Sequence, residues 1–194
     1  MSKKNLKESK LSTLEIAKEV GITLKNVRTF DHRRGQSLEC DVYLNGKLLA
    51  HASDEGNGGC MHIEATFKKD DFDEMRANRE IIQEVETAID KYPEFEMEYY
   101  GNTSMMKNDL ELIINALADD EVTKKEFNRN KKKGILFGDS IVKFKAGSIP
   151  KMIKTFGEDT ALSLIQIECD KITKADKNIE ILNKEYLESL GVKL

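Results

Sequence analysis

The sequence has no long apolar run and few cysteines, and each absence excludes a class of protein. None of its apolar runs approaches the roughly 18 residues that a membrane-spanning helix needs, and its polar beginning lacks the apolar segment of a secretory signal. The three cysteines form neither an even-numbered set nor a Cys-x-x-Cys pair, which favours reduced thiols. We therefore expect a soluble, cytoplasmic protein without a membrane partner.

The charge of the chain is nearly balanced. A net charge of −4 over 194 residues is too small to indicate an acidic mimic of DNA, and its sign argues against a surface that coats DNA. Charged residues make up 34% and hydrophobic residues 39%, which is usual for a globular protein. The length allows one full-sized core, or a domain with a small appendage.

The dipeptide Asn45-Gly46 stands between two apolar-rich runs and gives the clearest local structure in the chain. Both residues tolerate the positive φ angles of a type I′ turn, so they predict a two-residue β-hairpin loop. Further apolar-rich runs extend the hairpin to an antiparallel meander, with strands expected at residues 24–30, 38–44, 47–53 and 61–67. One face of such a meander needs a cover of helices.

Helical spacing of apolar residues supplies that cover. Ser12 and Glu15 form a capping box for a short helix, and Asp71 begins a longer helix that runs to residue 92. A third helix is expected to begin near Ser104, followed by a hairpin within 135–144, helices at 149–156 and 159–172, a strand at 179–182 and a helical turn at 185–190. The expected fold class is α+β, an antiparallel β-meander covered on one face by helices, with a short N-terminal helix. Residues 1–22 are the tail and this helix, and residues 23–194 are a single domain.

The two-residue loop also predicts which side chains face each other. Counting outward from it places Cys40 opposite His51 on one face of the sheet, and Cys60 and His62 share a face of the next strand. These four side chains are candidates for a zinc site or, as a Cys–His pair, for nucleophilic catalysis, although their spacing matches no standard zinc module. The alternative is that Cys40 packs in the core and His51 lies at the rim of the sheet. We expect neither a metal nor a cofactor.

The segment Asp54-Glu55-Gly56-Asn57-Gly58-Gly59 is a second candidate site. Successive glycines expose backbone N–H groups that can wrap an anion, and the side chain of Asn57 adds a donor. Asp54, Glu55 and Asn57 also offer oxygen ligands for a divalent cation, in positions that do not follow an EF-hand. Because a strand follows rather than a helix and two acids precede the glycines, a sharp turn between strands is the simpler interpretation.

Three further stretches are candidate contact surfaces. Either of two basic clusters is suited to nucleic acid or to an acidic protein face, although lysines near helix ends are usually just solvated. An acidic stretch at 94–100 alternates as an edge strand does and offers aromatic side chains for docking. The members are Arg28, His32, Arg33 and Arg34 in the first cluster, Lys124, Lys125, Arg129 and residues 131–133 in the second, and Phe95, Tyr99 and Tyr100 in the acidic stretch.

Residues 14–35 resemble the helix-turn-helix of MerR-type regulators. The likeness rests on Ile16-Ala17 as packing residues, Gly21 in the turn and Val27-Arg28 on a recognition helix. It implies a DNA-binding regulator whose duplex binding weakens as salt is added. A strand at 24–30 would exclude this interpretation.

A broader resemblance covers residues 22–183 with gaps. Residues 39–47, which carry Cys40 and Asn45-Gly46-Lys47, and the turn Gly56-Asn57-Gly58-Gly59 are similar to a family of uncharacterised bacteriophage and prophage proteins. In that family a Cys-containing strand runs into an X-Gly-Lys hairpin and an Asn/Asp-x-Gly-x-Gly-Gly turn follows. This chain departs from the pattern by having Asn57 where a histidine is expected. The resemblance implies a phage accessory protein that works in the cytoplasm of the host cell.

Three functions follow from these observations. The first is a non-enzymatic protein that binds and modulates or inhibits a host protein, for example a component of antiviral defence. The second is a small-molecule or nucleotide binder, or a hydrolase, that uses residues at the sheet rim: Cys40, His51, Asn57, Cys60 and His62. The third is a helix-turn-helix DNA-binding regulator, with nucleic acid as the less favoured partner.

Overall fold

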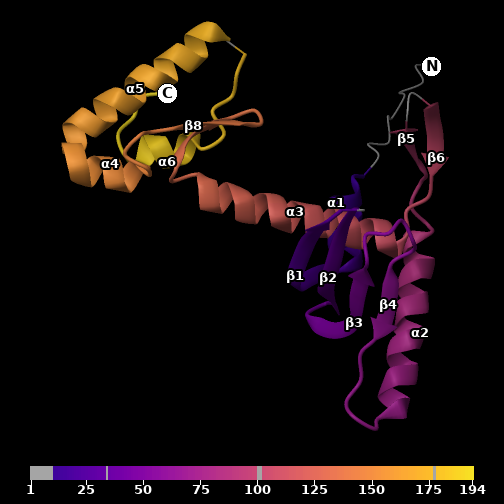
Figure 1. Cartoon of the computed structure of the whole chain (residues 1–194). Helices are drawn as coiled ribbons and strands as arrows, with labels where there is room; N and C mark the ends of the chain where they lie inside the picture. Colours follow the sequence, from indigo (N-terminus) through magenta and orange to yellow (C-terminus); the bar gives the residue numbers. More distant parts are fainter. Residues whose placement is uncertain (1–10, 34, 100–101, 177) are drawn as a thin grey trace, which may run out of the picture. The chain divides into compact units, whose positions relative to one another are not determined.

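The computed structural model describes residues 11–33, 35–99, 102–176 and 178–194, apart from the side chains of His32, Met97, Tyr99 and Asn102. The chain forms two compact units, of which unit 1 ends at Val122 and unit 2 begins at Thr123 (Figure 1). This division differs from the expected one, which separated residues 1–22 from a single domain at 23–194. The N-terminal helix belongs to unit 1 because its buried residues join the core of that unit, while the residues after 134 pack around a second core.

Unit 1 is built on a four-stranded antiparallel sheet in the order β1–β2–β3–β4. The strands are β1 (Ile22–His32), β2 (Gly35–Leu44), β3 (Lys47–Asp54) and β4 (His62–Ala65). Asn45 and Gly46 join β2 to β3 with φ angles of 49° and 82°, as a type I′ hairpin requires. The meander predicted from the sequence is therefore confirmed.

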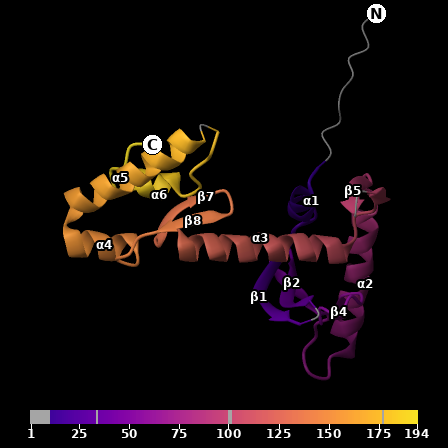
Figure 2. The same ribbon diagram turned by 45° about the horizontal axis from the view of Figure 1, so that its top comes forward.

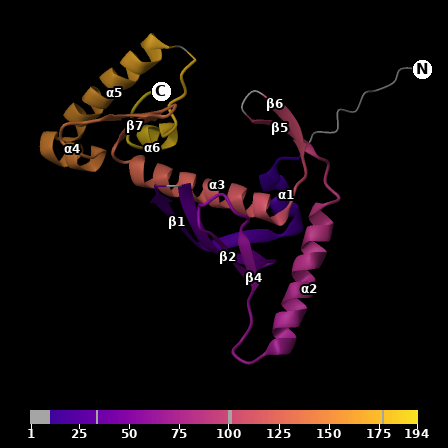
Figure 3. The same ribbon diagram turned by 45° about the vertical axis from the view of Figure 1, so that its right-hand side comes forward.

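Three helices cover one face of this sheet. α1 (Thr13–Val20) begins at the predicted capping box of Ser12 and Glu15, and α2 (Phe72–Ile89) begins at Asp71, whose side chain accepts from the Glu74 N–H. α2 lies beside β4 in all three views (Figures 1, 2 and 3). Apolar residues of α1, of α2 and of the first half of α3 (Leu110–Asn130) join the inward side chains of the sheet in one buried cluster. The predicted α+β fold class, with helices on one face and a short N-terminal helix, is confirmed.

A small hairpin stands where the sequence analysis placed the beginning of the third helix. β5 (Phe95–Tyr99) pairs with β6 (Asn102–Met106), so Ser104 lies in a strand and α3 begins only at Leu110. The Leu112 N–H donates to Asp109 Oδ1 at 2.7 Å, which caps α3 at that point. The edge strand predicted within 94–100 is confirmed, and its pairing with β6 overrides the helical pattern of the residues that follow.

Unit 2 has its own core between a hairpin and three helices. β7 (Gly134–Phe137) pairs with β8 (Ser140–Lys143), and α4 (Ile149–Phe156), α5 (Glu158–Ala175) and α6 (Lys184–Ser189) complete the unit. The strand predicted at 179–182 is reduced to a single bridge between Ile181 and Phe137. The other elements predicted for this part of the chain are confirmed.

Candidate functional site

β3 contains a β-bulge close to the predicted turn. Near the turn the register is the predicted one, but Val42 pairs with Ala50 instead of Leu49, so β3 holds one extra residue. Leu49 and Ala50 are 4% and 0% exposed, which means that both are buried although they are neighbours in the sequence. Such a bulge shifts every later side chain of the strand by one place.

The bulge separates Cys40 from His51. The register beyond it pairs Cys40 with Ala52 and Asp41 with His51, so the predicted cross-strand pair of Cys40 and His51 is wrong. Cys40 belongs to the buried core, where burial, together with the neighbouring carboxylate of Asp41, raises the pKa of its thiol to about 11. His51 is exposed on the opposite face of the sheet. The candidate Cys–His nucleophilic pair is therefore contradicted.

The candidate zinc ligands are not brought together either. Cys60 is exposed in the loop before β4, and His62 is exposed on β4, where it pairs with Ser53. Cys40 packs in the core, as the alternative interpretation expected. Within the described residues, no group of three or more His, Cys, Asp or Glu side chains is placed to hold a metal ion.

β1 contains a second bulge, at Asn26. Lys25 pairs with Asp41 and Arg28 with Glu39, so β1 has two residues where β2 has one. Asn26 adopts a left-handed backbone with a φ of 54°, which asparagine tolerates better than most residues do. Its Nδ2 donates to Asp41 Oδ2 at 2.6 Å. The second bulge thus supplies Asp41 with a hydrogen-bond donor from the neighbouring strand.

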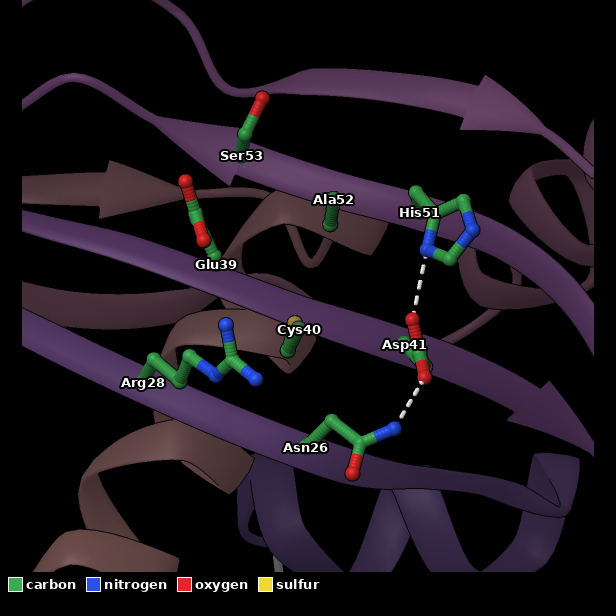
Figure 4. A pocket seen from close by; sticks show the side chains of 8 residues that line it. All are labelled: Asn26, Arg28, Glu39, Cys40, Asp41, His51, Ala52 and Ser53. Carbon is green, nitrogen blue, oxygen red and sulfur yellow. Dashed lines mark hydrogen bonds and ion pairs between the residues drawn. The ribbon is translucent and has the colours of Figure 1, made fainter.

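Asn26, Asp41 and His51 form a hydrogen-bonded chain across three strands (Figure 4). Asp41 Oδ2 accepts from Asn26, and Asp41 Oδ1 lies 2.5 Å from His51 Nδ1. The Asp41 side chain is 15% exposed, whereas the His51 side chain is 63% exposed. Because Nδ1 is bound to the carboxylate, Nε2 is the ring nitrogen that a ligand can reach, and Asp41 fixes the orientation of the ring.

This chain lies in a cavity of about 430 Å³ on the face of the sheet that the helices leave uncovered. Arg28, Glu39 and Ser53 form a second row of side chains across β1, β2 and β3, because the register pairs Arg28 with Glu39 and Glu39 with Ser53. Figure 4 shows this row beside the hydrogen-bonded chain. The cavity therefore presents cationic, anionic and neutral hydrogen-bonding groups together.

The open face of the sheet, by which we mean the side chains opposite the helices, extends beyond the cavity. Lys25 Nζ lies 4.3 Å from the ring centroid of Tyr43, a cation–π contact between β1 and β2. On β4, Glu64 pairs with His51. The open face includes Thr23, Lys25, Asn26, Arg28, Phe30, Glu39, Asp41, Tyr43, His51, Ser53, His62 and Glu64.

The glycine-rich loop borders a second cavity, of about 640 Å³. Asp54 Oδ1 accepts from the Gly56 N–H at 2.7 Å, and Gly56 lies against the backbone of Gln36. These contacts support the interpretation of the loop as a sharp turn. Arg33 and Asn57 line this cavity together with three carboxylates, those of Glu39, Asp54 and Glu55. This excess of negative charge disfavours a phosphate-like anion.

The predicted helix-turn-helix is contradicted by β1. The segment expected as a recognition helix, around Val27-Arg28, is an extended strand in the middle of an eleven-residue element. Its backbone pairs with β2, so it has no helical face to place in a DNA groove. Arg28 therefore lies on a strand at the open face and not on a recognition helix.

The remaining candidate residues lie apart from the hydrogen-bonded chain or outside the described part of the structure. His32 ends β1 and Tyr99 ends β5, in both cases with side chains that are not described. Arg34 and Tyr100 lie outside the described residues. Phe95 is half-buried at the beginning of β5.

Sequence reasoning missed five of the residues that line the first cavity, although the sequence holds one signal for them. Leu48-Leu49-Ala50 places three apolar residues in succession within an otherwise alternating strand, which marks the bulge in β3. The bulge in β1 is evident only in the structure, where Leu24 and Val27 both pack against the core although they are three residues apart. The missed residues are Asn26, Glu39, Asp41, Ala52 and Ser53.

The described residues form an α+β protein whose four-stranded sheet carries helices on one face and polar side chains on the other. Comparison of the chain with protein-family models, with curated proteins and with solved structures finds no match. Among the described residues, no helix has both the length and the apolar character needed to cross a membrane.

Proposed function

We propose that this protein is a non-enzymatic binding protein that contacts another protein through the open face of unit 1. In line with the resemblance to phage accessory proteins, the partner is a host protein that is modulated or inhibited, and a component of antiviral defence is one such target. The observation that carries the proposal is the open face itself. All four strands present polar side chains there, and none of the helices packed on the sheet covers them.

The charges of the open face favour a protein over a nucleic acid. Two cations, Lys25 and Arg28, stand beside three carboxylates, Glu39, Asp41 and Glu64. Phosphate groups would meet these carboxylates at close range, which is unfavourable. Protein interfaces, by contrast, commonly match mixed charges with complementary ones and gain specificity from them.

The side chains at the centre of this face are held in place before a partner arrives. Asn26, Asp41 and His51 fix one another through hydrogen bonds, and Lys25 is positioned over Tyr43. Side chains that are already ordered lose less conformational entropy on binding. This preorganisation supports a binding role for the face.

The experiment that tests the proposal is affinity capture from host cells, followed by identification of the retained protein by mass spectrometry. The double variant Glu39→Lys and Glu64→Lys reverses two charges of the open face. The matched control, Glu80→Lys and Glu84→Lys, reverses two exposed charges on α2. We expect the wild type and the control to retain a stoichiometric partner and the open-face variant to bind it at least tenfold more weakly.

Equal retention by both double variants would contradict the proposal, as would the absence of any stoichiometric partner. Far-UV circular dichroism of each variant shows whether the sheet is still folded. The purified partner then allows the dissociation constants of the three proteins to be compared directly.

A second candidate function is favoured by the chain of Asn26, Asp41 and His51. An exposed ion pair contributes about 0–1 kcal/mol to stability, and the left-handed backbone of Asn26 costs about 1 kcal/mol, so stability alone does not account for this arrangement. An exposed imidazole held by a carboxylate can bind or deprotonate a small ligand. A small-molecule or nucleotide binder, or a hydrolase, would use His51 at this site, and Cys40 and Cys60 would take no part.

The two exposed histidines of the sheet separate this function from the first. We expect that, if a small ligand binds here, one member of a panel of nucleotides and sugars raises the melting temperature of the wild type and of His62→Gln by several degrees, but not that of His51→Gln. If no compound of the panel raises the melting temperature of the wild type, this second function is contradicted. That result does not bear on the proposal that the open face binds a protein.

A further inference from the structure

Unit 2 carries an apolar groove of about 490 Å³. None of the residues that line it belongs to the open face of unit 1. One wall is formed by residues 142–146, at the end of β8 and beyond it, and the other by α4 and α5. We propose that this groove binds an acidic peptide segment of a partner protein, whose apolar side chains insert into it. The apolar lining consists of Val142, Phe144, Ala146, Met152, Phe156 and Leu164.

The helices expose apolar side chains at the groove although the unit has a complete core. Met152 is 2% exposed, but Phe156, one helical turn later on α4, is 50% exposed. Leu164 on α5 is 42% exposed and lines the same groove. Covering apolar surface stabilises a complex by roughly 25 cal/mol per Å², and a concave apolar patch of this kind is typical of a binding site.

The charges around the groove select an acidic occupant. Lys143 and Lys145 line the wall beyond β8, and both side chains are exposed. The one carboxylate of the lining, Glu168, is bound to Lys171, whose Nζ lies 2.7 Å from Glu168 Oε1. Lys143 and Lys145 therefore leave positive charge at the groove that Glu168 does not neutralise, and Asp or Glu in an incoming segment complements it.

The shape of the groove favours a peptide over a membrane surface. An apolar surface flanked by lysines can also bind anionic lipid. A membrane-binding surface, however, inserts apolar side chains that project outward into the bilayer. Here the apolar side chains line a concave groove between two walls. A peptide can place single side chains into such a groove, as in other groove-binding complexes.

The test is a selection from a displayed library of random twelve-residue peptides on the full-length protein. We expect the enriched peptides to combine Asp or Glu with Leu, Ile, Met or aromatic residues. A fluorescently labelled copy of the most enriched peptide then gives dissociation constants. Leu164→Asp and the double variant Lys143→Glu, Lys145→Glu should each weaken its binding at least tenfold.

Ile167→Asp is the matched control, because Ile167 is 48% exposed on the same helix and does not line the groove. It should bind the labelled peptide as the wild type does. Enrichment of basic peptides, or equal binding by Leu164→Asp and Ile167→Asp, would overturn the proposal. Binding of the wild type to phosphatidylglycerol vesicles that is lost in Leu164→Asp, without any enriched peptide, would replace it with a lipid surface. Because the groove lies in unit 2, none of these outcomes tests the function proposed for the open face.

Discussion

Gly56 packs directly against the backbone of Gln36, at the beginning of β2. A Cβ atom on Gly56 would lie 2.7 Å from both the carbonyl carbon and the carbonyl oxygen of Gln36, and the φ angle of Gly56 is +71°. Gly59, three residues later, has no positive φ angle and nothing within 4 Å of its Cβ position. Glycines of the same loop therefore differ in what the fold requires of them.

This difference predicts a graded series of alanine variants. Gly56→Ala should lower the free energy of unfolding by roughly 2 kcal/mol or more, since it combines a backbone clash with strain. Gly58→Ala, with a φ of +79° and open space, should lower it by about 1 kcal/mol. Gly59→Ala should stay within about 0.5 kcal/mol of the wild type. Urea unfolding followed by circular dichroism measures the series, and equal effects of Gly56→Ala and Gly59→Ala would contradict this account of the loop.

We expect the stability of unit 2 to depend strongly on the buried side-chain amide of Asn183. Its Oδ1 accepts from the Leu136 N–H at 3.0 Å, and its Nδ2 donates to the carbonyls of Lys131 and Gly134, each at 2.8 Å. Asn183→Ala should lower the free energy of unfolding by about 3 kcal/mol, because it leaves these buried groups without their partner.

Asn183→Asp serves as the nearly isosteric test, since an ionised carboxylate accepts but cannot donate. It should destabilise unit 2 as well. Asn178→Ala, at an exposed position, should change stability by less than about 0.5 kcal/mol. A hydrogen-exchange experiment reports on the amide of Leu136 itself, and unchanged protection in Asn183→Ala would refute the assigned role.

The three thiols should differ in reactivity. Cys60 is exposed, whereas Cys40 and Cys169 are buried, and burial raises the pKa of both buried thiols from 9.0 to about 11. Native protein at pH 8 should release one equivalent of thionitrobenzoate rapidly from Ellman's reagent, and two more only after urea is added. Cys60→Ser should abolish the rapid phase. A rapid second equivalent in the wild type would show that a buried thiol is accessible.

The raised pKa values also predict an effect of pH on stability. A thiol whose pKa is higher in the folded state stays protonated there while the unfolded chain already ionises. Its contribution to stability is therefore complete below pH 9 and is lost as the pH rises from 9 towards 11. The urea midpoint should fall over this window, and the double variant Cys40→Ala, Cys169→Ala should show a smaller fall than the wild type.

Two substitutions at Asn26 should separate the backbone contribution to stability from the side-chain contribution. Asn26→Gly and Asn26→Ala both remove the hydrogen bond to Asp41, but only alanine adds strain at a φ of 54°. The alanine variant should be less stable than the glycine variant by about 1 kcal/mol in urea unfolding. Equal stabilities would mean that the bulge relaxes once the asparagine is gone.

Most elements of the four-stranded sheet and its helices could be predicted from local signals. Asn45-Gly46 defines the central hairpin because few other residue pairs accept two positive φ angles. Ser12 with Glu15, and Asp71, mark the beginnings of α1 and α2 because their side chains satisfy the first free N–H groups of each helix. The hairpin at β5 and β6 was missed because a strand depends on a partner strand, which the segment near Ser104 does not reveal by itself.

The candidate site could be predicted only in part. The sequence by itself determined that His51 lies on the four-stranded sheet, whereas only the structure decided that Arg28 lies on a strand and not on a recognition helix. The tertiary structure decided that His51 meets Asp41 and that Cys40 faces the core. The reason is that each bulge lets residues at irregular spacing, Leu49 with Ala50 and Leu24 with Val27, pack against the core that the sheet shares with the helices. Register therefore depends on residues far away in the sequence, and a count outward from the turn cannot recover it.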